Sequence, residues 1–256
     1  MKWIMVFLLS SVLFATEGKI VYEKKCASCH EGYISMGKLS ENFLEKNNEM
    51  LKLKAPTMNQ LSFRLKQQIG DPKGDNEIHR MEVEAFISDY LINPDKEKTF
   101  CMTEVIKHFD TMPSMKGKIT EEEMSAVSGF IYDFDSKAVS EHIVKYEAFD
   151  KALEKAKAED KIVMIKASAK HCHYCIKMDR EVLVVESVKD ALLKDFVPVH
   201  VDISKNRLPL GLKADMTPTF FFIDKNEKVI KAIPGAWNVE DFLEILKEIN
   251  HLKGEQ

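Results

Sequence analysis

The hydrophobic pattern of the first half of the chain follows helical periodicity. Apolar positions predict helices over Gln60–Ile69 and Glu82–Leu91. A third helix is predicted after Thr120, which forms an S/T-x-x-E capping box with Glu123 ahead of apolar residues at helical spacing. No stretch of this half alternates as a strand would. We therefore expect an all-α fold here.

From about Glu141 the pattern becomes mixed. A helix is predicted first, with one apolar face. Four short strands and a last helix, capped by Asn238, are predicted after it. Strands alternating with helices and ending in a hairpin indicate a mixed α/β sheet covered by helices. The apolar face comprises Tyr146, Phe149, Leu153 and Ala156, and the strands are expected near 162–167, 197–203, 219–223 and 229–233.

The N-terminus predicts export. The apolar run Trp3–Ala15 follows Lys2 and is shorter than the roughly 20 residues that span a bilayer core. Ala15 is a small residue of the kind that signal peptidases prefer, although Leu13 stands where a second small residue is usual. We predict a signal peptide over 1–15 and a periplasmic location without a transmembrane segment in the mature chain. An uncleaved short anchor stays open.

Composition and cysteine usage narrow the function. The 41 acidic and 37 basic residues are interspersed, and nothing in them indicates binding to nucleic acid or to an anionic membrane. Five cysteines form two C-x-x-C pairs and leave Cys101 over. We expect Cys101 to pack as a small hydrophobic residue, with a regulatory thiol as the alternative.

The first pair, Cys26 and Cys29, is followed directly by His30. Two thiols on one helical turn can add to the two vinyl groups of one haem, and the next histidine then lies against the iron. A small disulfide or half of a zinc site are the alternatives. No second ligand pair lies at zinc spacing, so we expect a covalent haem c.

With this early motif, and Met112-Pro113 followed by Gly117 and the capped helix, the chain resembles class I cytochromes c. The resemblance implies an all-α cytochrome c domain over 16–137, Cys26 and Cys29 as the haem thioethers, and His30 and Met112 as axial iron ligands. Met115 is a close rival of Met112, and Met58 is a distant one. The long section between His30 and Met112 departs from compact members of that family.

The second pair, Cys172 and Cys175, follows a predicted buried strand and opens a helix, where the helix dipole stabilises a thiolate. With Thr217-Pro218 ahead of another strand, the segment Lys161–Asn250 resembles the thioredoxin superfamily. It is most similar to periplasmic thioredoxin-like domains such as the C-terminal domain of the Dsb transmembrane reductase. The resemblance implies an α/β thioredoxin fold over 138–256.

The same resemblance implies roles for individual residues. Cys172 would attack and Cys175 resolve, while Pro218 would be a cis-proline that helps to bind the partner chain. Lys166 stands where thioredoxin has a buried aspartate, and His171 stands where it usually has tryptophan. His173 either influences the thiolate or points to solvent, and the sequence leaves this open.

Together the motifs predict a periplasmic thiol:disulfide oxidoreductase joined to a haem electron carrier. Its partners would be thiol or disulfide client proteins and a respiratory electron donor or acceptor. The link between the two activities is inferred only from their presence on one chain. Two alternatives remain: an electron-carrier cytochrome whose thioredoxin-like domain only docks a partner, or a copper or zinc site. The residues of that metal site would be His171, Cys172, His173 and Cys175.

Overall fold

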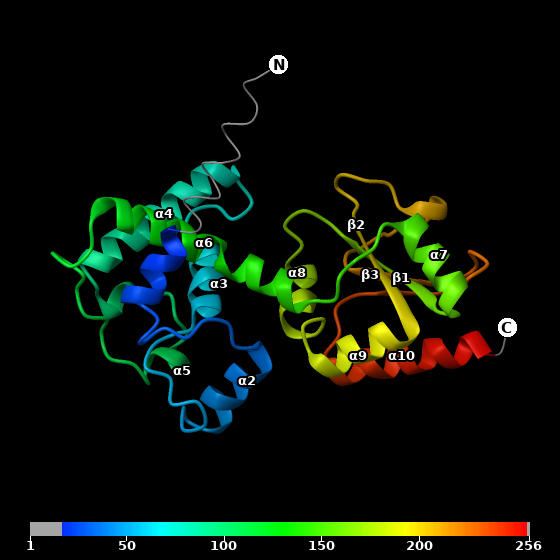
Figure 1. The fold of residues 1–256 in the computed structure, drawn as a ribbon, viewed down its shortest axis with the longest axis horizontal. Coiled ribbons are helices and arrows are strands. Elements are labelled where there is room, and N and C mark those ends of the chain that lie inside the picture. The colour runs from blue at the N-terminus through cyan, green and yellow to red at the C-terminus, as the bar shows by residue number, and fades with distance from the viewer. Residues whose placement is uncertain (1–16, 255–256) are drawn as a thin grey trace, which may run out of the picture. The chain divides into compact units, whose positions relative to one another are not determined.

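The computed structural model describes residues 17–254 of the chain (Figure 1). The predicted signal peptide over 1–15 therefore lies outside the described residues. The chain divides into two compact units, one ending at Ala138 and the other starting at Val139. Among the described residues, no helix combines the length and the apolar character needed to cross a membrane.

Helices and turns make up the N-terminal unit, and residues 17–138 contain no strand. The prediction that this half is helical is thus confirmed, whereas the finer prediction of a cytochrome c fold stays a prediction. The elements are a helix over 17–25, α2 (Met36–Ser40), a π-helix (Glu41–Glu45), α3 (Met58–Gln68), α4 (Asn76–Ile92), a 3-10 turn (Lys96–Lys98), α5 (Thr103–Ile106) and α6 (Glu121–His142).

Side-chain caps decide where these helices begin. The capping box of α6 is confirmed, because Thr120 N–H donates to Glu123 Oε2 at 3.0 Å and Glu123 N–H donates to Thr120 Oγ1 at 3.2 Å. Helix α4 starts earlier than predicted, at Asn76, because the Asp75 carboxylate accepts the backbone N–H groups of Glu77 and Ile78. The apolar periodicity shows only the later part of this helix.

The first and last helices of the N-terminal unit cross at Gly18. A Cβ atom at this position would lie 2.2 Å from the carbonyl oxygen of Ala126 and 2.7 Å from Cβ of Phe130, both in α6. Near the other end of the first helix, Lys25 Nζ donates to the carbonyl of Lys118 at 2.6 Å and to Glu123 Oε2 at 2.7 Å. The early Cys26 motif is thereby tied to the segment just before α6.

Replacing Gly18 with alanine should lower the free energy of unfolding by about 1–3 kcal/mol, because overpacking a close helix crossing costs that much. Gly37→Ala is the matched control, since Gly37 also lies in a helix but a Cβ there meets nothing within 4 Å. Denaturant titration followed by far-ultraviolet circular dichroism measures both variants. Equal effects of the two substitutions would contradict the close crossing.

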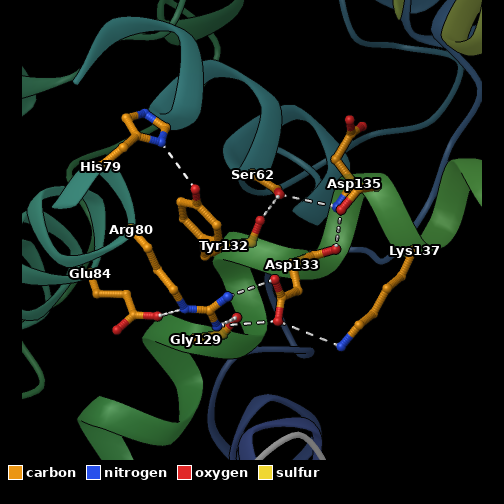
Figure 2. A network of polar contacts seen from close by, with 10 residues as sticks. Ser62, His79, Arg80, Glu84, Gly129, Tyr132, Asp133, Asp135 and Lys137 are labelled. Carbon is orange, nitrogen blue, oxygen red and sulfur yellow. Dashed lines mark hydrogen bonds and ion pairs between the residues drawn. The ribbon is translucent and has the colours of Figure 1, made fainter. Parts of the chain in front are cut away.

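A polar network joins α4 to α6 (Figure 2). Arg80 donates to both carboxylate oxygens of Asp133, at 2.9 and 3.2 Å, and its Nε donates to Glu84 at 2.6 Å. The Arg80 guanidinium also lies 4.8 Å from the ring centroid of Tyr132, whose hydroxyl is 3.0 Å from His79 Nδ1. These contacts hold the two helices together along one side and contain no cysteine or methionine.

The described part of the C-terminal unit has one sheet of four strands in the order β2-β1-β3-β4. β1 is parallel to β2 and antiparallel to β3, and β3 is antiparallel to β4. The predicted mixed sheet is therefore confirmed. Its elements are α7 (Phe149–Glu159), β1 (Ile162–Ser168), α8 (His173–Glu181), α9 (Glu186–Asp195), β2 (Phe196–Asp202), a 3-10 turn (Pro209–Gly211), β3 (Thr219–Ile223), β4 (Val229–Pro234) and α10 (Val239–Gly254).

One expectation for this unit is wrong. Tyr146 does not belong to the first helix, because α7 begins at Phe149. The chain before α7 instead runs beside β2, where Glu147 N–H donates to the carbonyl of Pro198 at 2.9 Å. This placement brings the Tyr146 ring within 5.3 Å of the His200 ring, measured between centroids.

The two faces of the sheet pack against different helices, as Figure 1 shows. In β1, Ile162 and Met164 belong to the core shared with α8, α9 and α10, whereas Val163 and Ile165 belong to the core shared with α7. Successive side chains of a strand alternate between faces. Lys166 therefore points to the same face as Met164, toward α8.

Candidate active site

The first cysteine motif forms a tight turn at the end of the helix over 17–25. The carbonyl of Cys26 accepts the backbone N–H groups of Cys29 at 3.0 Å and His30 at 2.9 Å, so the three residues lie on one turn. Both cysteines are free thiols, with Cys26 half-buried and Cys29 exposed. The Tyr22 hydroxyl donates to the His30 carbonyl at 2.8 Å. The backbone of the motif is thus held in place on both sides.

The imidazole of His30 is oriented by a carbonyl from another segment. Nδ1 of His30 lies 2.8 Å from the carbonyl oxygen of Pro56. Burial lowers the pKa of His30, while the bond to Pro56 raises it. A carbonyl only accepts, so Nδ1 carries the proton and Nε2 of the neutral ring carries the lone pair. This tautomer is the one that ligates a metal through Nε2.

The candidate distal methionines lie around one apolar core of the N-terminal unit. Met112 and Met115 are partly buried and pack against the core that Cys26 also touches, while Met58 lies inside it at 1% exposure. Met115 N–H donates to the carbonyl of Leu91 at 2.8 Å. All three candidates belong to or pack against the apolar core that Cys26 also contacts, and this shared core does not choose among them, so Met112 as the ligand stays a prediction.

The second cysteine motif caps α8 and is oxidised. Cys172 and Cys175 are joined by a disulfide, with their Cα atoms 5.2 Å apart. Cys172 is the N-cap of α8, and its Sγ accepts the backbone N–H of Cys175 at 3.1 Å. Cys172 is half-buried, whereas Cys175 is only 4% exposed. The outer sulfur therefore lies at the positive end of a helix and within reach of a partner.

The residues flanking Cys172 differ in exposure. His171 has a left-handed backbone with φ of 56°, a region in which histidine is tolerated better than most residues. Its Nε2 is buried and has no hydrogen-bond partner. His173 and Tyr174 are both exposed, with ring centroids 5.6 Å apart. Of the two roles left open for His173, its exposure is consistent with a side chain at the solvent.

A proline loop lies at the same end of the sheet as this disulfide. The Thr217–Pro218 peptide is cis, as the resemblance implied. Thr219, the next residue, pairs with Ala167 near the end of β1, from which the chain runs directly into Cys172. The Pro218 carbonyl accepts Gly235 N–H at 2.8 Å. Strand register thus brings Pro218 to the end of the sheet where the disulfide lies.

A comparison with protein families decides the class of this unit. Residues 149–250 match the family model described as a thioredoxin-like domain. The C-terminal unit is a thioredoxin-like domain. Through it the chain belongs to the thioredoxin-like family. An uncharacterised protein of Aquifex aeolicus is 31% identical over 117 residues, which cover 45% of this chain and 72% of that protein.

Several solved structures are similar to part of the chain. A thioredoxin from Thermus thermophilus is 26% identical, with 41% of this chain and 86% of that one covered and a TM-score of 0.37. A DsbH oxidoreductase is 22% identical, with 43% and 86% covered and a TM-score of 0.37. The oxidised C-terminal domain of DsbD from Neisseria meningitidis is 19% identical, with 41% and 98% covered and a TM-score of 0.32.

A buried ion pair lies in the thioredoxin-like domain, between β1 and α8. The side chain of Lys166 is 1% exposed, and its ammonium group binds the carboxylate of Asp179. Burial lowers the pKa of Lys166, and Asp179 opposes that effect. Sequence analysis singled out Lys166 but missed Asp179. Asp179 stands four residues after Cys175 on a predicted helix, and this spacing could have indicated that it lies on the same helix face as Cys175.

Two further candidates from the sequence are the metal site around the second cysteine motif and the thiol of Cys101. Within residues 17–254, no three histidine, cysteine, aspartate or glutamate side chains come together in a way that could hold a metal ion. The copper or zinc alternative around Cys172 and Cys175 therefore finds no ligand cluster. Cys101 is a partly buried free thiol whose pKa is raised by burial. It belongs to neither motif.

Proposed function

We propose that this chain is a thiol:disulfide oxidoreductase whose thioredoxin-like domain is joined to a c-type haem electron carrier, and that it acts in the periplasm. The observation that carries the exchange activity is the Cys172–Cys175 disulfide at the N-terminus of α8, at the same end of the sheet as cis-Pro218. Thiol–disulfide exchange needs an accessible sulfur that is stabilised as a thiolate. Cys172 meets both requirements.

The exchange runs through a mixed disulfide. In the reduced domain, Cys172 thiolate attacks one sulfur of a client disulfide, and the other client sulfur leaves as a thiolate. Cys175 then attacks Cys172 Sγ, which restores the Cys172–Cys175 disulfide and releases the second client thiolate. Two electrons pass from the domain to the client, and each step also runs in reverse. The short spacing lets Cys175 reach Cys172 without movement of α8.

The residues around the first motif fit a covalently bound haem. Cys26 and Cys29 lie on one turn as free thiols, and the bond from His30 Nδ1 to Pro56 leaves the lone pair on Nε2. The apolar core that touches Cys26 and Met112 suits a porphyrin face. In this proposal Cys26 and Cys29 form the thioethers, and His30 and Met112 bind the iron. When bound, the haem supplies reversible one-electron transfer.

The periplasmic location is proposed from the signal peptide predicted over 1–15 and from the chemistry. An oxidising, extracytoplasmic compartment is compatible with both motifs: with a dithiol that cycles through a disulfide, and with a motif for covalent haem attachment. The partners proposed are thiol or disulfide client proteins for Cys172 and a respiratory electron donor or acceptor for the haem.

Reduction of the haem by a protein dithiol tests the joined function. In full-length, haem-loaded protein, reduced thioredoxin should reduce the haem through Cys172, because this sulfur is the accessible member of the pair. Each dithiol gives up two electrons and each haem would take one, so two haems would be reduced for every disulfide formed. Cys172→Ser should lower the rate of haem reduction to the rate at which reduced thioredoxin reduces the haem directly, without the Cys172–Cys175 pair. Visible absorption under anaerobic conditions measures the rate, and Cys101→Ser, outside both motifs, is the control.

Two outcomes separate the parts of this proposal. If haem does not stay with the denatured polypeptide, measured by mass and visible absorption, the carrier part is wrong while the exchange activity stands. If haem stays attached but Cys172→Ser is reduced as fast as the parent protein, the two domains work independently. The thioredoxin-like domain would then serve partner docking.

A further inference from the structure

The segment that carries the disulfide is locally basic, although the chain as a whole is acidic. The full chain has a formal net charge of −4. Residues 169–178, which include Cys172 and Cys175, instead contain two lysines and two histidines and no carboxylate. Lys170 and Lys177 are both exposed, and neither forms an ion pair within residues 17–254. Two free positive charges therefore flank the reactive sulfur in the sequence.

The loop between β2 and β3 lies against this segment and adds to its charge. Lys170 N–H donates to Ser204 Oγ at 2.8 Å, so the start of the loop contacts the residues that lead to Cys172. Lys205 pairs with Asp202 at 3.6 Å. The remaining charged side chains of residues 203–216 are two exposed cations and one exposed carboxylate, namely Arg207, Lys213 and Asp215.

The carboxylates next to these lysines do not neutralise them. Asp179, two residues after Lys177, binds the buried ammonium group of Lys166. Glu181 lies one helical turn after Lys177 on α8, but no ion pair joins them in the described structure. Asp202 accepts the backbone N–H of Ser204 at 3.0 Å in addition to its pairing in the loop. The positive potential around the disulfide is thus left for an outside partner.

Exposed apolar side chains lie on the same two segments. Tyr174, inside the C-x-x-C motif, is 60% exposed, and Met216, two residues before cis-Pro218, is 55% exposed. The pairing of Thr219 with Ala167 brings the end of this loop to the end of the sheet where the disulfide lies. Tyrosine and methionine are enriched where proteins contact one another. The surface therefore combines apolar contact area with unpaired cations.

We propose that this surface docks client proteins whose reactive cysteine is flanked by acidic side chains and by an apolar residue. Lys170 and Lys177 attract the acidic side chains, and Tyr174 and Met216 contact the apolar residue. Complementary charge raises the rate of association and suppresses partners of the wrong sign. The inference rests on the proposed exchange at Cys172, for which it names the class of client, and it is independent of the haem.

Three synthetic peptides test the charge preference. Each contains one cysteine next to a leucine, is joined to a second copy by a disulfide, and carries either aspartates, serines or lysines on both sides. The reduced full chain, with Cys26, Cys29 and Cys101 replaced by serine so that these thiols do not react, is mixed with each peptide. Acid quenching followed by chromatography measures the peptide thiol that is released.

The acidic peptide should react about tenfold faster than the basic one at neutral pH and low salt, a modest effect for electrostatic steering. The net charge of the whole chain would by itself give the opposite order. In 1 M salt, where the screening length is about 3 Å, the difference should largely disappear. The serine peptide should react at an intermediate rate under both conditions.

Two charge-reversed variants locate the effect. Lys170→Glu/Lys177→Glu should remove the preference for the acidic peptide. The readout is the ratio of the acidic to the basic rate constant, because a change in the reactivity of Cys172 itself alters all the rates alike. Lys151→Glu/Lys155→Glu is the matched control, since it makes the same charge change at exposed positions of α7, which packs on the other face of the sheet. It should keep the preference.

The outcomes keep the possible failures apart. Equal rates for the three peptides at low salt, or an equal loss of the preference in both charge-reversed variants, would overturn the docking surface and leave the exchange activity standing. If the parent protein releases no thiol from any peptide, the proposed exchange at Cys172 is wrong instead. Circular dichroism of the oxidised proteins verifies that each variant is folded.

Discussion

Replacing Cys172 with serine should abolish thiol–disulfide exchange by this protein, whereas replacing Cys175 should leave the first step intact and trap the client. The reason lies in the unequal surroundings of the two sulfurs. Cys172 is half-buried at the start of α8 and its Sγ accepts the Cys175 N–H at 3.1 Å, while Cys175 is 4% exposed. A hydrogen bond and a helix N-terminus both favour the thiolate of Cys172.

The measurement is a mixed-disulfide assay with a disulfide-bonded client. Cys175→Ser should accumulate a covalent complex that migrates as one species on a non-reducing gel and separates with dithiothreitol. Cys172→Ser should form none above background, and Cys101→Ser should behave as the parent protein. If Cys172→Ser trapped the client and Cys175→Ser did not, the roles of the two sulfurs would be reversed.

Replacing Asp179 alone with leucine should destabilise the thioredoxin-like domain strongly. The substitution leaves the ammonium group of Lys166 at 1% exposure without its counter-charge. Breaking a buried ion pair by removing one member costs about 3–5 kcal/mol, whereas replacing both members by apolar residues is often neutral or stabilising. The double variant Lys166→Met/Asp179→Leu should therefore recover most of the lost free energy of unfolding.

The pH dependence provides a second measure of the same pair. Burial lowers the pKa of Lys166 in the folded protein, so between the folded and unfolded pKa values the unfolded chain binds more protons. The free energy of unfolding should thus rise with pH toward the unfolded lysine pKa of about 10.4. The rise should begin at a lower pH and be larger in total in Asp179→Leu, because Asp179 no longer opposes the effect of burial on the Lys166 pKa, and it should be absent in the double variant.

Trp237 packs against the core of the thioredoxin-like domain. Denaturant titration of the oxidised protein, followed by the fluorescence of Trp237, therefore reports on this domain. A loss below about 1 kcal/mol for Asp179→Leu, the range of exposed ion pairs, would show that Lys166 reaches water. Asp179 would then not be needed to neutralise a buried charge. Lys166→Met alone should cost less than Asp179→Leu, because the remaining carboxylate is 29% exposed and can be hydrated.

Local patterns of the sequence determined most of the elements and both cysteine motifs. The alternation of Val197, Val199 and Val201 predicts β2, and the capping box at Thr120 predicts the start of α6. These features depend on neighbours within a few residues, which a sequence displays directly. The C-x-x-C spacing likewise specifies that one turn carries both sulfurs.

Contacts between residues that are distant in the chain were decided only by the tertiary structure. The carbonyl that orients His30 belongs to Pro56, and the backbone that approaches Gly18 closely is that of Ala126. A backbone carbonyl carries no sequence signal, and the contact of Gly18 depends on the path of α6. The N-terminal unit shows the same limit, because its methionines lie around one core and local pattern cannot rank them.

The buried pair illustrates the division most clearly. The sequence alone determined that a lysine interrupts the apolar strand at Lys166 and that the cysteine pair opens the following helix. It did not determine that the lysine would be neutralised by Asp179. That pairing required β1 and α8 to pack face to face, so that burial made an unpaired charge costly and the nearest carboxylate on the helix offset that cost.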